Sequence, residues 1–299
     1  MINTELRRLA RRSPYIARGL HRILSLLQHT RRQPGDVPAG PAIRGSQAYQ
    51  MPLEPWHIAF IDDLLQKVSL KNKRALDVGC GRGEVAREVI RRVGEVVIDG
   101  IDSDLCGLAD TQEETSQSLT IRRMDVTRLD FPDACFDVAY SLNVFEHIND
   151  LKGAYRELRR VLKLGGMLYL HSSPIWTSYR GHHFNHWDSD YVDLIPPWGH
   201  LYLGKNRLFK DIAQKKGSAV AVEAMTHIYK SNYLNRASIS DHKRYVRESG
   251  FKVVKLTEVT AFESIEPPSA EYVQKVAHST GLSPEELMVD GLGLLLERA

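Results

Sequence analysis

Strand-like and helix-like segments alternate along the chain from Leu53 onward, and this alternation restricts the fold more than any other feature. Short apolar runs such as residues 74–80 fit buried strands. Residues 84–93 repeat apolar side chains at helical spacing, and residues 151–166 do the same up to a closing glycine pair. Strands that alternate with helices predict an α/β fold with a doubly wound, mostly parallel sheet. Its ligands should bind beyond the carboxyl ends of the strands.

Residues 75–84, ALDVGCGRGE, place three alternating glycines behind an aspartate where a predicted strand gives way to a helix. A phosphate-binding P-loop is excluded because it needs G-x-x-x-x-G-K-[ST], and no such lysine is present. A dinucleotide fingerprint, G-x-G-x-x-G, would need a glycine at the position of Glu84. The spacing is instead D-x-G-x-G-x-G, which brings a carboxylate and an unobstructed backbone close to one ligand.

This stretch resembles the first motif of class I S-adenosylmethionine-dependent methyltransferases. The resemblance implies a Rossmann-like fold with S-adenosylmethionine as the cofactor. In that arrangement Asp77 faces the ammonium and sulfonium charges of the cofactor. The turn lies against the amino-acid part of the cofactor, and it consists of Gly79, Cys80, Gly81 and Gly83.

Further stretches between about residues 50 and 175 support the resemblance. GIDSD ends the second predicted strand with Asp102 and Ser103, where an acidic side chain binds ribose hydroxyls. The resemblance implies that Asp125 and Val126 contact the adenine. It also implies three residues that line the exit of the fourth predicted strand: Ser141, Leu142 and Asn143.

Two more features agree with the same family. The dipeptide Glu146-His147 follows the fourth predicted strand, as EH does in these enzymes. ELRRVLKLGG departs from the family pattern only at Leu164, where proline is usual, and this departure affects a turn. The resemblance further implies that GLGLLLERA, residues 291–299, is a last strand that runs antiparallel to close the sheet.

The basic charge of the chain is concentrated at its amino terminus. The formal net charge is +3, but residues 1–44 carry nine arginines against Glu5 and Asp36. Apolar residues at helical spacing in this segment predict an amphipathic helix followed by a linker. Such a helix can pack on its own domain, mediate self-association or lie on an anionic membrane. We therefore expect a tail over residues 1–44 and a methyltransferase domain over residues 45–299.

An aromatic and histidine-rich insertion, about residues 174–234, follows the fifth predicted strand. Its position beyond a strand end predicts a lid over the active site. His182 and His186 have the i, i+4 spacing of helical metal ligands, but no H-E-x-x-H motif or supporting cysteine accompanies them, so we expect no metal. A hydroxyl acceptor would need a general base, for which the candidates are His147, His182 and His183. Each of these histidines could instead serve only packing or hydrogen bonding.

The acceptor is the least determined part of the function. The N-P-P-Y and P-C signatures of DNA methyltransferases are absent, and residues 45–299 are net acidic, which argues against DNA. We expect O-methylation of a carbohydrate or another small hydroxylated metabolite. The alternatives are C-methylation of a lipid-like quinone precursor and a non-catalytic, cofactor-binding partner protein. Without a secretory signal or a membrane span in the sequence, we expect a cytoplasmic location.

Overall fold

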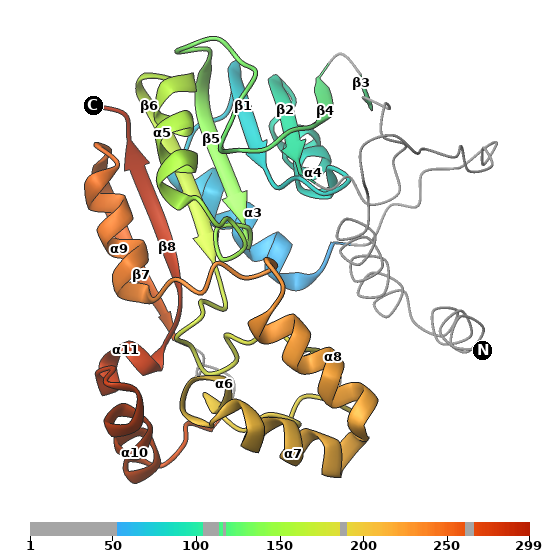
Figure 1. Cartoon of the computed structure of the whole chain (residues 1–299). Helices are drawn as coiled ribbons and strands as arrows, with labels where there is room; N and C mark the ends of the chain where they lie inside the picture. The colour runs from blue at the N-terminus through green and yellow to red at the C-terminus, as the bar shows by residue number, and fades with distance from the viewer. Residues whose placement is uncertain (1–52, 104–113, 116–117, 186–189, 261–265) are drawn as a thin grey trace, which may run out of the picture. The chain divides into compact units, whose positions relative to one another are not determined.

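The computed structural model describes residues 53–103, 114–115, 118–185, 190–260 and 266–299. The helix and linker predicted for residues 1–44 lie outside the described residues. Met51–Ala299 form one compact unit. In its described part, an eight-stranded sheet separates two layers of helices (Figure 1).

The strand order is β3-β4-β2-β1-β5-β6-β8-β7. Strands β4, β2, β1, β5 and β6 pair in parallel, whereas β8 is antiparallel to both of its neighbours. The predicted α/β class, the mostly parallel sheet and the antiparallel last strand are therefore confirmed. The strands are β1 Lys73–Val78, β2 Val96–Asp102, β3 Glu114–Thr115, β4 Leu119–Arg123, β5 Phe136–Leu142, β6 Leu162–Ser172, β7 Lys252–Thr260 and β8 Val289–Glu297.

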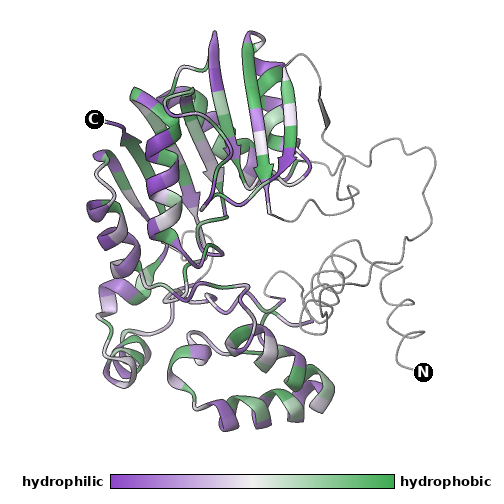
Figure 2. Cartoon of the chain, turned by 45° about the horizontal axis from the view of Figure 1, so that its top comes forward, coloured by the Kyte–Doolittle hydropathy of each residue, from purple (hydrophilic) through white to green (hydrophobic). Residues whose placement is uncertain are grey.

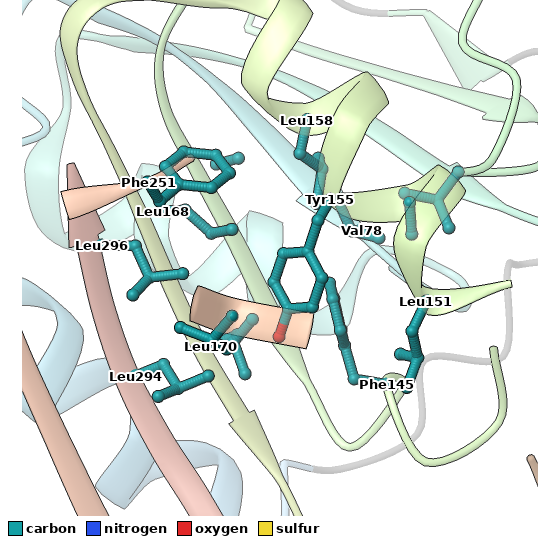
Figure 3. Close-up of a cluster of buried hydrophobic side chains, with 14 of the residues drawn as sticks. Val78, Phe145, Leu151, Tyr155, Leu158, Leu168, Leu170, Phe251, Leu294 and Leu296 are labelled. Carbon is teal, nitrogen blue, oxygen red and sulfur yellow. The ribbon is translucent and has the colours of Figure 1, made fainter. Parts of the chain in front are cut away.

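Helices cover both faces of the sheet because each buries one apolar stripe. α3 and α4 share a buried cluster with one face, and α5 and α9 share another cluster with the opposite face. In Figure 3, Tyr155 and Leu158 of α5 lie over Leu168 and Leu170 of β6, with Leu294 of β8 beside them. The helices are α3 Pro55–Lys67, α4 Glu84–Val93, α5 Leu151–Val161, α6 Gly199–Tyr202, α7 Lys205–Lys216, α8 Ser218–Tyr229, α9 Ile239–Glu248, α10 Ala270–Thr280 and α11 Pro284–Met288.

The glycine pair at residues 165–166 does not close a helix, so that detail of the prediction is wrong. α5 ends at Val161, and β6 begins at the next residue. Gly165 has φ +73° and its N–H donates to the Arg298 carbonyl, while the Gly166 carbonyl accepts from the Arg298 N–H. The glycines therefore form an irregular start of the strand that pairs with the carboxyl-terminal end of the chain.

The segment predicted as a lid begins beyond the carboxyl end of β6 and holds α6, α7 and α8. Figure 1 shows these helices at the end of the sheet toward which the arrows of β5 and β6 point. They enclose their own buried cluster, which includes Leu208, Ile212 and Ile228. Within the described residues, no helix combines the length and apolar character that crossing a bilayer requires.

Candidate functional site

The glycine-rich turn joins β1 to α4 at the carboxyl edge of the sheet. Gly79, Gly81 and Gly83 all have positive φ, at +75°, +56° and +82°. A Cβ atom at Gly79 would collide with the side chain of Val144, and one at Gly83 would lie 2.6 Å from Ile121 Cδ1. At Gly81 the nearest atom would be Glu84 Oε2, 3.7 Å away. Two of the glycines are thus required by packing, while the third leaves space beside the turn.

Asp77 is the buried carboxyl group of this turn. It is only 4% exposed and lies in register between Gly100 of β2 and Tyr140 of β5. Burial raises the pKa of its carboxyl to about 8, an effect opposed by the Tyr140 hydroxyl and increased by Asp102 and Glu84. Neither Asp77 Oδ2 nor that hydroxyl completes a hydrogen bond of good geometry within the described residues. A buried carboxylate oxygen without a donor fits a cationic ligand group such as an ammonium.

Asp102 connects the glycine turn to the exit of β4. Its Oδ2 accepts a hydrogen bond from the Gly81 N–H at 3.0 Å, and its carbonyl accepts one from the Met124 N–H at 3.0 Å. Asp125, the residue after Met124, is exposed. The structure therefore brings Asp77, Asp102 and Asp125 to one edge of the sheet, as the sequence predicted for parallel neighbouring strands.

The immediate surroundings of these aspartates limit which atoms can meet a ligand. Asp125 Oδ1 accepts from both the N–H and the hydroxyl of Thr127, each at 2.8 Å, so this oxygen stabilises a turn. Val126 is buried, and the Ser103 side chain is exposed at the end of β2. Cys80 is buried against Gly100, and burial raises the pKa of its thiol.

The predicted residues at the exit of β5 differ in what they can offer a ligand. Ser141 is fully buried, and its hydroxyl donates to the Val78 carbonyl at 2.9 Å, which links β5 to β1. Leu142 packs in part against the cluster under α3 and α4. Asn143 has φ +53°, and its side-chain oxygen lies 3.1 Å from His171 Nδ1. Their contact with a cofactor stays a prediction.

Glu146 lies at the same edge of the sheet, and its motif alone indicates no chemical role for it. It is 2% exposed, and its Oε2 accepts from the Ser172 hydroxyl at 2.7 Å. Burial raises the pKa of this carboxyl to about 8, and the Ser172 hydrogen bond opposes the shift. Its Oε1 lies 3.9 Å from His147 Nε2. The available signal was the EH dipeptide itself, but only the fold reveals that the glutamate is buried.

Two of the three candidate base histidines meet at this edge. His147 Nδ1 lies 2.8 Å from the Tyr233 carbonyl, which can only accept, so Nδ1 carries the hydrogen and Nε2 can accept a proton. The ring centroids of His147 and His183 are 5.1 Å apart, and the Tyr233 ring is 4.4 Å from His147. The His183 Nε2 donates to the Pro174 carbonyl at 2.6 Å.

His182 is placed differently from that pair. It is buried, its ring centroid is 5.4 Å from that of His200, and its Nδ1 accepts from the Phe184 N–H. His186, its partner in the i, i+4 spacing, lies outside the described residues. Across the part of the chain that the structure describes, no three histidine, cysteine or acidic side chains are grouped so as to hold a metal ion.

Comparisons with known proteins agree with this geometry. Residues 76–170 match the family model of a methyltransferase domain. A sterol 24-C-methyltransferase of Gibberella zeae is 37% identical over 98 residues, which cover 31% of this chain and 26% of that protein. A 2-phytyl-1,4-naphthoquinone methyltransferase of Nostoc punctiforme is 29% identical over 169 residues, 49% of this chain and 72% of that protein.

Solved structures align over a larger part of the chain at lower sequence identity. A crystal structure of a sarcosine dimethylglycine methyltransferase from Galdieria sulphuraria aligns over 82% of this chain and 85% of its own, with a TM-score of 0.47 and 16% identity. The chain spans only about a quarter of the length of the sterol methyltransferase. The family match nevertheless includes the glycine turn, the three aspartates and the Glu146-His147 pair. The chain therefore carries a class I S-adenosylmethionine-dependent methyltransferase domain.

Proposed function

We propose that this protein transfers a methyl group from S-adenosylmethionine to a small-molecule acceptor. The observation that carries the proposal is the buried Asp77 carboxyl beside an open glycine turn, inside the region that matches the methyltransferase domain. In this proposal Asp77 holds the ammonium group, and Asp102 holds the ribose hydroxyls. Asp125 reads the adenine amino group through its Oδ2, because its Oδ1 is engaged by Thr127.

The remaining predicted residues complete the cofactor site in this proposal. The backbone of the glycine turn and Cys80 follows the amino-acid part of the cofactor, and Val126 and Ser103 border the adenine and the ribose. Leu142 and Asn143 lie nearest the methyl-donating end. Ser141 contributes indirectly, because its hydroxyl fixes β5 against β1.

The chemistry that the protein must add is modest. When bound, S-adenosylmethionine supplies a methyl group that is already activated on a positively charged sulfur. The protein holds the acceptor atom in line with this group at about 3 Å. His147 Nε2 takes the proton that the acceptor loses, since the Tyr233 carbonyl keeps the hydrogen on Nδ1. The Glu146 carboxyl lies 3.9 Å from this nitrogen and stabilises the resulting imidazolium once it has released its own proton.

We propose a lipid-like acceptor that is methylated on carbon, in preference to a carbohydrate. The relatives described above are named for a sterol and for a quinone with a phytyl chain, not for a sugar. The rings of Tyr233 and His183 pack against the ring of His147. An aromatic surface of this kind suits a flat or apolar acceptor. The second candidate is O-methylation of a hydroxylated metabolite. His147 favours it, because this side chain is partly exposed and its Nε2 can accept the proton of a hydroxyl group.

Replacement of Asp102 by alanine tests the cofactor site. We expect Asp102→Ala to weaken S-adenosylmethionine binding by about 10- to 100-fold in calorimetry, because charge-assisted hydrogen bonds contribute roughly 1.5–3 kcal/mol. Asp133→Ala is the matched control, since this exposed aspartate lies before β5, at the opposite edge of the sheet. Equal affinity of both variants for the cofactor would refute the assignment.

The acceptor class needs a separate assay. The wild-type protein is offered a quinone with an isoprenoid chain, a sterol and a set of sugars, and release of S-adenosylhomocysteine is measured. We expect release with an apolar acceptor. Release only with sugars would reinstate carbohydrate O-methylation. Cofactor binding without release from any class would favour the non-catalytic alternative.

A further inference from the structure

The helices α7 and α8 form a hairpin with a charge opposite to that of the surrounding domain. We call residues 204–230 the basic hairpin. It contains six basic side chains and two acidic ones, a net charge of +4. The remainder of residues 53–299 contains 25 basic and 33 acidic side chains, a net charge of −8. A local reversal of this size orients a protein relative to a charged surface.

Most of this positive charge is not neutralised by neighbouring acids. Arg207 and Asp211 form an ion pair at 2.8 Å. The hairpin has five lysines: Lys205, Lys210, Lys215, Lys216 and Lys230. Within the described residues, none of them forms an ion pair with a carboxylate. All five are exposed. Two of them lie over aromatic rings, Lys205 over Tyr229 and Lys216 over Tyr191, so their positions are defined by packing.

Two aliphatic side chains are exposed near the tip of the hairpin. Gly217 joins the two helices, and Ala219 and Val222 lie in the first turns of α8. Val222 is 57% exposed, whereas the opposite stripe of α8, including Ala221 and Ala224, is fully buried. Figure 2 shows hydrophilic and hydrophobic stretches following one another along these helices. A cluster of exposed lysines beside exposed aliphatic side chains suits a surface of anionic lipid headgroups.

We propose that the basic hairpin docks the protein on a membrane that contains anionic lipids. The lysines bind lipid headgroups, and Val222 with Ala219 enters the headgroup layer. Nucleic acid is a less suitable partner, because the aliphatic tip would gain nothing from a phosphate backbone. This inference concerns binding and does not depend on the identity of the methyl acceptor.

The hairpin also connects this surface to the candidate active site. α8 starts at the tip and ends at Tyr229, about 18 Å away for twelve helical residues. Near its end, the His227 ring lies 4.9 Å from the Tyr233 ring, which contacts His147. If the proposed function holds, a docked hairpin places the proton acceptor one helix length from the lipid phase.

Charge reversal on the hairpin tests the docking. Full-length protein is sedimented with vesicles of phosphatidylcholine, alone or mixed with phosphatidylglycerol. We expect the triple variant Lys205→Glu/Lys210→Glu/Lys216→Glu to lose at least about tenfold in affinity for the anionic vesicles. The control reverses three lysines elsewhere: Lys71→Glu, Lys73→Glu and Lys152→Glu. Because this control makes the same change in net charge, equal losses in both variants would contradict a specific role of the hairpin.

A local probe separates the hairpin from the basic residues 1–44. Val222→Trp is compared with Val254→Trp, because both valines are exposed, at 57% and 49%. We expect brominated lipids in anionic vesicles to quench the added tryptophan at position 222 and not at position 254. Equal quenching at both positions would overturn the proposal. Retention of the protein on RNA through the same lysines, without vesicle binding, would also overturn it.

Discussion

At the scale of single residues, the site depends on carboxyl groups that the fold keeps away from water. Glu146 is the clearest case, because its two oxygens have different neighbours: the Ser172 hydroxyl on one side and His147 on the other. The charge of Asp290 raises the pKa of Glu146 in addition to burial. Because Glu146 Oε1 lies 3.9 Å from His147 Nε2, we expect the protonation of one group to affect that of the other.

Glu146→Gln tests this coupling without any need for an acceptor. We expect the ring signals of His147, followed by nuclear magnetic resonance across pH, to shift in two steps in the wild-type protein. In Glu146→Gln they should shift in a single step, because glutamine cannot take up a proton. Ser172→Ala is the control, since it removes the hydrogen bond at 2.7 Å but keeps the carboxyl. A single step in the wild-type protein would show that the two groups are independent.

At the scale of elements, the turn after β1 is fixed by both conformation and contact. Gly79 combines a φ of +75° with close approach to Val144, the residue two positions beyond β5. This contact explains why a motif in one βα unit depends on the next strand along the sheet. A glycine required only for its φ would tolerate alanine better.

We expect Gly79→Ala to lower the free energy of unfolding by about 2–4 kcal/mol, from left-handed strain together with overpacking. Gly281→Ala should cost only about 1–2 kcal/mol, because Gly281 has φ +74° but no atom within 4 Å of a Cβ. In denaturant titrations, adding Val144→Ala should recover part of the loss in Gly79→Ala. No recovery would mean that the cost is conformational alone.

At the scale of the whole molecule, the sequence predicts those structural features that are determined by residues close together in the chain. The strands β1, β2, β4, β5 and β6 follow from apolar runs, and the positions of Asp77, Asp102 and Asp125 at strand ends follow from motif spacing. The two-residue strand β3 was not predicted. The contact of His147 with His183 does not, because it joins the exit of β5 to a segment after β6. The helix α7 was missed although Leu208 and Ile212 have helical spacing, since aromatic and histidine residues dominate the segment before it. The glycine pair was misassigned because its partner, Arg298, is distant in sequence.

The buried ionisable groups also set how the stability of the whole protein depends on pH. Asp77 and Glu146 have folded pKa values near 8, above their unfolded values, so folding takes up protons and stability falls as pH rises toward 8. His200 and His242 have folded pKa values near 4, lowered by burial from about 6.5. These histidines make stability rise with pH between about pH 4 and 6.5, because in this range the unfolded chain binds more protons than the folded protein does. The two effects therefore oppose each other below pH 6.5, and above it only the carboxyl groups act.

We expect the free energy of unfolding of the cofactor-free protein to change little between about pH 5 and 6.5 and to fall by roughly 3 kcal/mol between pH 6.5 and 8, because each of the two carboxyl groups contributes about half of this fall. Urea titrations at these pH values measure it. In Asp77→Asn/Glu146→Gln the fall above pH 6.5 should disappear, because neither side chain then titrates. His242→Gln is the control, since it should alter the acid side and leave the alkaline fall unchanged. Saturating S-adenosylmethionine should also reduce the fall, because a cation beside Asp77 stabilises the carboxylate that forms as pH rises. An alkaline fall that persists in the double variant would place its origin in other groups.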